Sequence, residues 1–118
     1  MSATRRFHVE ARHDVTVIEL LDARLFDALV VSELQDDLID FLEQQQPRKV
    51  LVNFAGVTHC STSVINAMLR AKKRVAAAQG QLKLCCLADT IREAYRMLNL
   101  EGTVFDIHDS ADEALRSF

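Results

Sequence analysis

One stretch near the middle of the chain, residues 50–79, constrains the fold more than any other part of the sequence. It opens with the apolar run Val50-Leu51-Val52-Asn53-Phe54, which has the length of a buried strand. After a break at Ala55-Gly56, residues 57–60 form a second short extended piece. Apolar side chains then recur at helical spacing, at Val64, Met68, Ala71, Val75 and Ala78. The stretch therefore predicts a strand, a turn and an amphipathic helix whose Met68 faces the sheet.

Three hydroxyl side chains, Ser61, Thr62 and Ser63, come just before this helix. A helix begins with unpaired N–H groups and a partial positive charge, so its first turn favours oxygen acceptors and phosphate. Each of the three residues is therefore either a helix cap or a phosphate acceptor. We expect Ser61 to be the better cap, because it precedes the first helical residues, and Thr62 to keep an accessible hydroxyl.

The rest of the chain alternates between strand and helix patterns. Four further strands are predicted, at residues 7–11, 15–21, 81–87 and 104–107. Three further helices are predicted, and their starts are marked by a capping box at Ser32-x-x-Gln35, by Asp89-Thr90 and by Asp109-Ser110. Pro47 ends the first of these helices. Strands separated by amphipathic helices are typical of a mixed α/β sheet with βαβ connections.

Residues 22–31 are harder to assign. They bridge the second strand and the next helix, and we expect their apolar residues to pack locally. These residues are Leu25, Phe26, Leu29 and Val30.

Length and composition limit the classes of protein that need to be considered. A chain of 118 residues, 49% of them hydrophobic, is long enough for one core, so residues 1–118 are interpreted as a single domain. The net charge of −3 does not favour nucleic acid as a partner. No segment is apolar for long enough to span a membrane. The three cysteines suggest no disulfide framework, which is typical of a reducing cytoplasm.

No group of residues indicates catalysis or metal binding. His59 and Cys60 are neighbours on an extended piece, so their side chains point to opposite faces and cannot easily form a thiol–base pair. Cys60 is interpreted as a small buried residue, and Cys85-Cys86 as part of the packing of a strand. The four histidines do not have the spacing of metal ligands, and no glycine-rich phosphate loop is present.

Residues 50–87 resemble the centre of a STAS domain, the family of sulphate-transporter and anti-sigma-factor-antagonist domains. The family pattern is an apolar strand ending in Asp-x-Ser-x-Val, then Asp-Ser-Ser-Gly-Leu opening a helix, then a Gly-Gly turn. Three segments take these places here: Asn53-Phe54-Ala55-Gly56-Val57, Ser61-Thr62-Ser63-Val64-Ile65 and Gln79-Gly80-Gln81. The resemblance extends from about Phe7 to Leu115. Ser61 stands where the family has Asp, and Thr62 stands at the acceptor position.

The resemblance implies an α/β fold, with a mixed sheet of about five strands and about four helices, mostly on one face. It also implies a non-enzymatic, cytoplasmic switch domain of bacterial signalling that needs no cofactor or metal. The partner would be an anti-sigma factor with serine/threonine kinase activity. Phosphorylation of Thr62, with Ser61 or Ser63 as second choices, would release that partner.

The partner would dock through the start of the central helix and its flanking loops. The candidate contacts are Thr58, His59, Asn66, Arg70 and Lys73. The last two belong to a basic cluster at residues 70–74, which is either a solvated helix face or a docking face for an acidic partner. The aspartates at 22, 27, 36, 37 and 40 could serve a basic partner in the same way.

A second interpretation follows from the Ser-Thr-Ser version of the motif. The chain would then be a scaffold STAS domain that is never phosphorylated and assembles with itself or with other STAS domains. In either case we expect a monomer or a weak homodimer that binds neither nucleic acid nor a membrane.

Overall fold

The computed structural model describes residues 6–118 and has a five-stranded main sheet in the order β1-β2-β4-β6-β7. Its strands are β1 (Phe7–Arg12), β2 (Val15–Leu20), β4 (Lys49–Asn53), β6 (Gln81–Cys85) and β7 (Asp106–His108). Two short strands, β3 (Arg24–Leu25) and β5 (His59–Cys60), form a second sheet. The helices are α1 (Ala28–Gln45), α2 (Thr62–Ala77), α3 (Asp89–Met97) and α4 (Ala111–Arg116). The predicted mixed α/β fold is confirmed.

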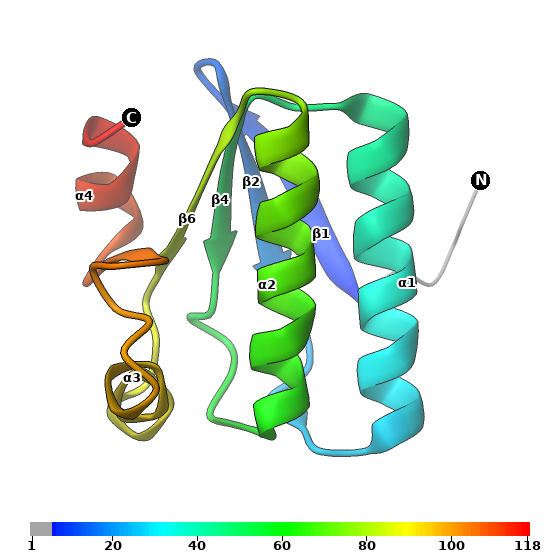
Figure 1. The fold of residues 1–118 in the computed structure, drawn as a ribbon, viewed down its shortest axis with the longest axis vertical. Coiled ribbons are helices and arrows are strands. Elements are labelled where there is room, and N and C mark those ends of the chain that lie inside the picture. Colours follow the sequence, from blue (N-terminus) through cyan, green and yellow to red (C-terminus); the bar gives the residue numbers. More distant parts are fainter. Residues whose placement is uncertain (1–5) are drawn as a thin grey trace.

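The main sheet is antiparallel at one edge and parallel elsewhere. β1 and β2 form the predicted hairpin, while β2, β4, β6 and β7 pair in parallel. Each parallel pair needs a crossover connection, and α1 and α2 provide two of them. Figure 1 shows α1 and α2 side by side over one face of the sheet, with α4 away from them beyond β6.

The larger core lies between the sheet and the pair α1 and α2. Met68 on α2 and Leu34 on α1 are 0% exposed, as are Ile18, Val52 and Leu84 on three neighbouring strands. Parallel strands with both faces covered are continuously apolar, which explains the run at Val50-Leu51-Val52. The predicted central strand and the orientation of Met68 are both confirmed.

A second, smaller core lies on the opposite face, under α4. Val17, Leu51, Cys85 and Ala114 form it, with Phe118 packed at its edge. The Lys83 ammonium is nearly buried here, where it donates to the Ser117 carbonyl at 2.9 Å and pairs with Asp106 at 3.0 Å. These contacts hold α4 on the face away from α1 and α2.

The start of the first helix was predicted wrongly. α1 begins at Ala28, four residues before Ser32, because the Asp27 carboxylate accepts hydrogen bonds from the N–H groups of Leu29 and Val30. A real cap thus replaces the predicted box at Ser32 and Gln35. The end was predicted correctly, since Gln46 adopts a left-handed conformation just before Pro47.

Two smaller boundaries also differ from the prediction. Ala88 occupies the N-cap position of α3, so Asp89 lies inside the helix, and no side chain caps it. The last strand begins at Asp106, because the N–H groups of Val104 and Phe105 both bond to the Leu100 carbonyl in a turn. The predicted cap at Ser110 is confirmed by its bond from the Glu113 N–H at 3.1 Å.

The turn between α2 and β6 has a steric reason for its glycine. A Cβ atom on Gly80 would lie 2.7 Å from the Arg48 carbonyl oxygen, which also accepts from the Gln81 N–H. The two backbone segments that lead into β4 and β6 therefore touch at this point. Only glycine allows so close an approach of two backbones.

Candidate functional site

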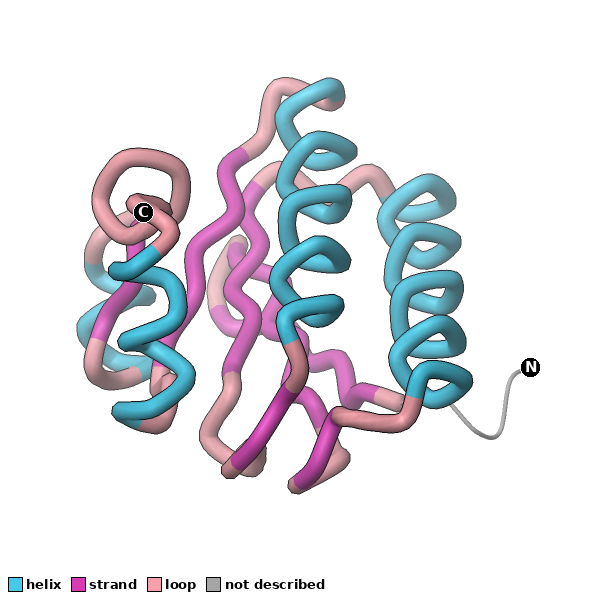
Figure 2. The backbone as a smooth tube through the Cα atoms, turned by 60° about the horizontal axis from the view of Figure 1, so that its bottom comes forward, coloured by secondary structure: helices cyan, strands magenta, loops and turns pink. Residues whose placement is uncertain are grey.

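The predicted hydroxyls 61–63 and the two contacts Thr58 and His59 lie at the end of the molecule where α1 and α2 both begin. After β2 and β4 the chain forms β3 and β5, which pair in parallel with Leu25 opposite Cys60. Figure 2 shows these two short strands side by side just before the two helices. The Ser61 N–H donates to the Leu25 carbonyl at 2.9 Å, which ties the start of α2 to the segment that precedes α1.

Thr58 lies just before β5 and His59 is the first residue of that strand. The Thr58 hydroxyl and N–H both donate to the Ala23 carbonyl, at 3.0 and 2.8 Å. The Thr58 oxygen also lies 3.0 Å from His59 Nδ1, and the His59 ring stacks obliquely on Phe26 at 6.1 Å between centroids. Both side chains are exposed, so they form part of the surface at this end.

The three hydroxyls at the start of α2 have different roles. Ser61 occupies the N-cap position, but its side chain makes no capping hydrogen bond, so the predicted Ser61 cap is wrong. Its Oγ lies 2.6 Å from Ser63 Oγ instead. Thr62 is the first residue of the helix and is exposed, and its side chain makes no hydrogen bond among the described residues. Thr62 is therefore the hydroxyl of the three that is not engaged with another side chain.

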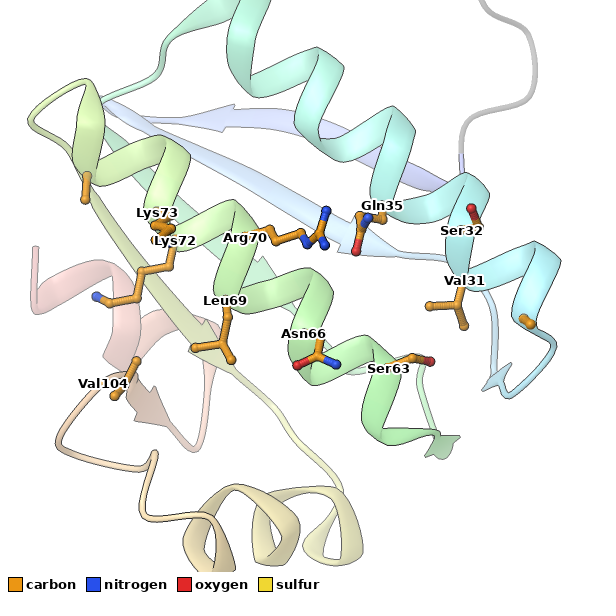
Figure 3. A pocket seen from close by; sticks show the side chains of 12 residues that line it. Val31, Ser32, Gln35, Ser63, Asn66, Leu69, Arg70, Lys72, Lys73 and Val104 are labelled. Carbon is orange, nitrogen blue, oxygen red and sulfur yellow. The ribbon is translucent and has the colours of Figure 1, made fainter.

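The remaining candidates follow one face of α2. A groove of about 790 Å³ runs along this helix, lined on the α2 side by Ser63, Asn66, Arg70 and Lys73. From α1, Ser32 and Gln35 line it as well, and Figure 3 shows Arg70 and Gln35 pointing toward one another across it. The structure thus divides the five candidate contacts into two groups. Thr58 and His59 lie at the end, and Asn66, Arg70 and Lys73 lie along the groove.

A family model of the STAS domain matches residues 6–114. The chain belongs to the STAS domain family. The match spans the main sheet, the second sheet and most of α4, which confirms the resemblance seen in the sequence. No curated protein sequence is similar enough to count as a match.

Solved structures of other STAS proteins share this fold. A STAS domain protein from Planctomyces limnophilus is 25% identical, with a TM-score of 0.80 over 94% of this chain and 96% of its own. An anti-sigma factor antagonist from Mycobacterium paratuberculosis is 14% identical, with a TM-score of 0.80 over 94% and 91%. The Bacillus cell fate determinant SpoIIAA in its phosphorylated form is 20% identical, with a TM-score of 0.70 over 94% and 97%.

Sequence reasoning missed two exposed apolar residues of this STAS domain. Phe26 and Leu29 were expected to pack locally, but they are 55% and 68% exposed, while Leu25 beside them is buried. They lie just before α1 and in its first turn, and Phe26 contacts His59. The signal was present in the sequence, because residues 25–31 hold more apolar side chains than one buried helix stripe can take.

The neighbouring thiol is not poised for chemistry. Cys60 is half-buried beneath the end surface, and burial raises the pKa of its thiol to about 11, so the thiolate is scarce at neutral pH.

Among residues 6–118, no group of three or more His, Cys, Asp or Glu side chains is arranged to hold a metal ion. In the same part of this STAS domain, no helix is long and apolar enough to cross a membrane.

Proposed function

We propose that this STAS domain is a cytoplasmic switch that binds an anti-sigma factor with serine/threonine kinase activity and is controlled by phosphorylation of Thr62. The observation that carries the proposal is the exposed Thr62 side chain at the first position of α2, beside two serines that bond to each other. Ser61 and Ser63 are second choices, because a kinase would first have to break their mutual hydrogen bond.

The start of α2 is suited to hold a phosphate. No side chain caps this helix, so the N–H groups of its first turn have no side-chain acceptor among the described residues. A phosphate on Thr62 would add close to two negative charges and three acceptor oxygens at that position. The helix start favours such an anion, so the modification would leave the fold intact.

The same phosphate would weaken binding of the partner. Phe26 and Leu29 offer apolar contact area at the same end, next to Thr58 and His59, and a docked partner would cover them together with Thr62. A doubly charged group inside such an interface must lose its water, and desolvation of an unpaired charge is costly. Release of the partner therefore follows from charge and desolvation, without refolding. Solved phosphorylated SpoIIAA, which shares this fold, supports the proposal by analogy.

Phosphorylation is tested by intact-protein mass spectrometry. The protein is incubated with ATP and a candidate anti-sigma factor kinase, and a gain of one phosphate is expected on the parent but not on Thr62→Ala. The matched control is Thr90→Ala, which removes another exposed threonine at a helix start. Phosphate on the Thr62→Ala variant would move the acceptor to Ser61 or Ser63, and no phosphate on any variant would contradict the switch.

Binding provides the second measurement. Thr62→Glu places one negative charge at the helix start, so we expect its dissociation constant for the anti-sigma partner to rise at least about tenfold, a loss of about 1.4 kcal/mol. Thr62→Ala should bind like the parent protein, and both variants should keep its melting temperature. Equal binding of Thr62→Glu and Thr62→Ala would show that charge at this position is not the switch.

A scaffold function is the second candidate. One observation favours it: Ser61 replaces the acidic residue of the family motif, and its bond to Ser63 organises the loop without a carboxylate. The domain would then act through self-association or assembly with other STAS domains. Unphosphorylated protein that forms homo-oligomers and does not bind any anti-sigma factor would support this function over the switch.

A further inference from the structure

The two helices on the outer face of the molecule carry opposite charges. α1 contains five acidic side chains and neither Lys nor Arg: Glu33, Asp36, Asp37, Asp40 and Glu43. α2 contains four basic side chains and neither Asp nor Glu: Arg70, Lys72, Lys73 and Arg74. The two helices lie side by side over the same face of the sheet (Figure 1). The outer surface of this layer is therefore divided into an acidic half and a basic half.

These charges point away from the sheet. Leu34 and Leu38 on α1, and Met68 and Ala71 on α2, are 0% exposed and define the buried sides of the two helices. Asp36 and Asp40 lie on the opposite side of α1, and Arg70 and Lys73 on the opposite side of α2, and all four are exposed. A second molecule could thus touch both charged halves at once.

Few of the charges are neutralised within the molecule. Arg74 pairs with Glu43 at 2.9 Å, and Glu33 pairs with Arg6 at 3.1 Å. Among the described residues, Arg70, Lys72, Lys73, Asp36 and Asp37 make no ion pair, and Asp40 only accepts from Gln44 on its own helix. The unpaired charges lie near the middle of both helices, where an incoming surface would meet them.

The charged residues of the two helices can also be compared by their positions along the helix axes. Both helices run in the same direction, because each connects one parallel strand to the next. The Arg74–Glu43 ion pair sets Arg74 level with Glu43, and Gln35 of α1 and Asn66 of α2 line the same groove. Counting back from that ion pair, Asp40 lies level with Ala71, and Asp36 lies level with Ala67, about 4.5 Å along the axis from the level of Arg70. The basic residues 70–74 therefore overlap in height with the second half of the acidic stretch 36–43.

From this arrangement we infer that the outer face of α1 and α2 binds a second copy of this chain. A two-fold axis parallel to the helices places α1 of each copy on α2 of the other and keeps the levels unchanged. Acidic and basic residues then face each other in two equivalent contacts. A two-fold axis across the helices would instead place α1 on α1 and α2 on α2, and like charges would repel. The charge pattern thus selects one of the two arrangements.

The size of the face indicates a weak dimer. Helices of 18 and 16 residues are about 25 Å long, and two of them side by side cover on the order of 500 Å², below the roughly 800 Å² that each partner gives to a standard interface. Exposed ion pairs add little each and are screened by salt. We expect dimerisation to be strongest at low ionic strength and high protein concentration.

This inference deepens the self-association candidate and does not depend on phosphorylation. Arg70 and Lys73 are also proposed contacts for an anti-sigma factor, so the dimer and that complex would compete for them. Thr62 lies at the end of α2, away from residues 70–74. A Thr62→Ala protein that dimerises normally but is no longer phosphorylated would separate the two proposals.

The test is charge reversal followed by sedimentation equilibrium. Reversing the three unpaired charges of α2, with Arg70→Glu, Lys72→Glu and Lys73→Glu, makes both halves acidic. Reversing the three unpaired charges of α1, with Asp36→Lys, Asp37→Lys and Asp40→Lys, makes both halves basic. In each case we expect the dimer dissociation constant to rise at least about tenfold relative to the parent. The protein carrying all six changes regains halves of opposite charge and should dimerise like the parent, which also shows that the substitutions are compatible with folding.

A zero-length cross-link locates the contact. Carbodiimide joins a carboxylate to a lysine amine with loss of water, and a mixture of ¹⁴N and ¹⁵N protein identifies cross-links between copies by mass. We expect mixed-isotope products that join residues 36–43 to Lys72 or Lys73. A monomeric parent protein at low salt, charge-reversed variants that dimerise like the parent, or mixed products confined to other surfaces would each overturn the inference.

Discussion

At the residue scale, two helix starts that look alike in the sequence differ in chemistry. Asp27 accepts hydrogen bonds from two N–H groups of α1, whereas Ser61 caps nothing and bonds to Ser63. The position of a hydroxyl near a helix start can be read from the sequence. Its hydrogen-bond partner cannot, because a rotation of one side chain decides between the backbone and a neighbouring hydroxyl. For the same reason, the predicted importance of Thr62 remains a prediction.

This difference predicts unequal costs for two matched substitutions. Asp27→Ala removes a working cap and should lower the free energy of unfolding by about 0.5–2 kcal/mol. Ser61→Ala removes no capping bond, so its effect should stay within about 0.5 kcal/mol, as for an ordinary surface change. Urea unfolding of both variants against the parent is the measurement. A larger loss for Ser61→Ala than for Asp27→Ala would mean that the two caps are assigned the wrong way round.

At the scale of elements, hydrophobic spacing predicted the buried side of α2 but not the start of α1. On α2, Val64, Met68 and Val75 repeat at helical spacing, and all three are buried. Around α1, apolar residues continue on both sides of the true start, so spacing does not separate buried Leu25 from exposed Phe26. Which of these two side chains is buried depends on the pairing of β3 with β5, and this pairing joins residues far apart in the sequence.

The packing of α2 can be tested at its centre. Met68 is 0% exposed in the larger core, so Met68→Ala removes buried methylene groups and leaves a cavity. It should cost about 2–5 kcal/mol of unfolding free energy, and Asn66→Ala on the exposed side of the same helix is the matched control. Thermal melts compare the two. Equal melting temperatures would mean that α2 presents a different side to the sheet.

At the scale of the whole molecule, the order of elements was the most predictable property. Alternating strands and helices restrict the chain to a parallel sheet with crossovers, and few arrangements of that kind exist. The side taken by α4 was less predictable, because a six-residue helix carries too few apolar positions to show which face it covers. Its place depends on Lys83, a charged residue that spacing alone does not mark as buried.

The ion pair between Arg92 and Glu101 should make the stability of the domain depend on pH in the acid range. The Arg92 guanidinium donates to Glu101 at 2.9 Å and holds the pKa of that carboxyl below its usual 4.5. A lowered pKa in the folded state gives stability that is fully present above about pH 4.5 and is lost as the pH falls through the lower, folded pKa. The pair joins α3 to the segment before β7, so its loss should weaken the whole domain.

Glu101→Gln removes the titrating group and keeps the shape of the side chain. We expect the parent protein to be more stable than this variant from pH 7 to about pH 5, with the difference shrinking as the pH falls below about 4.5. Asp36→Asn, at an exposed carboxylate that makes no ion pair among the described residues, serves as the control. Urea unfolding at several pH values gives the comparison. A difference that stays constant down to pH 2 would show that Glu101 contributes no charge-dependent stability.

The β1–β2 hairpin also bears on how fast the chain can fold. Its turn at His13-Asp14 joins two neighbouring strands, and contacts so close in sequence form within about 1–10 μs in isolated hairpins. The two strands of each parallel pair are separated in the sequence by a connection that includes a helix. Bringing such strands together closes a long loop, and the entropy lost in closing it slows folding. We therefore expect the rate of folding to be limited by the docking of the crossover helices, which include the two oppositely charged helices α1 and α2.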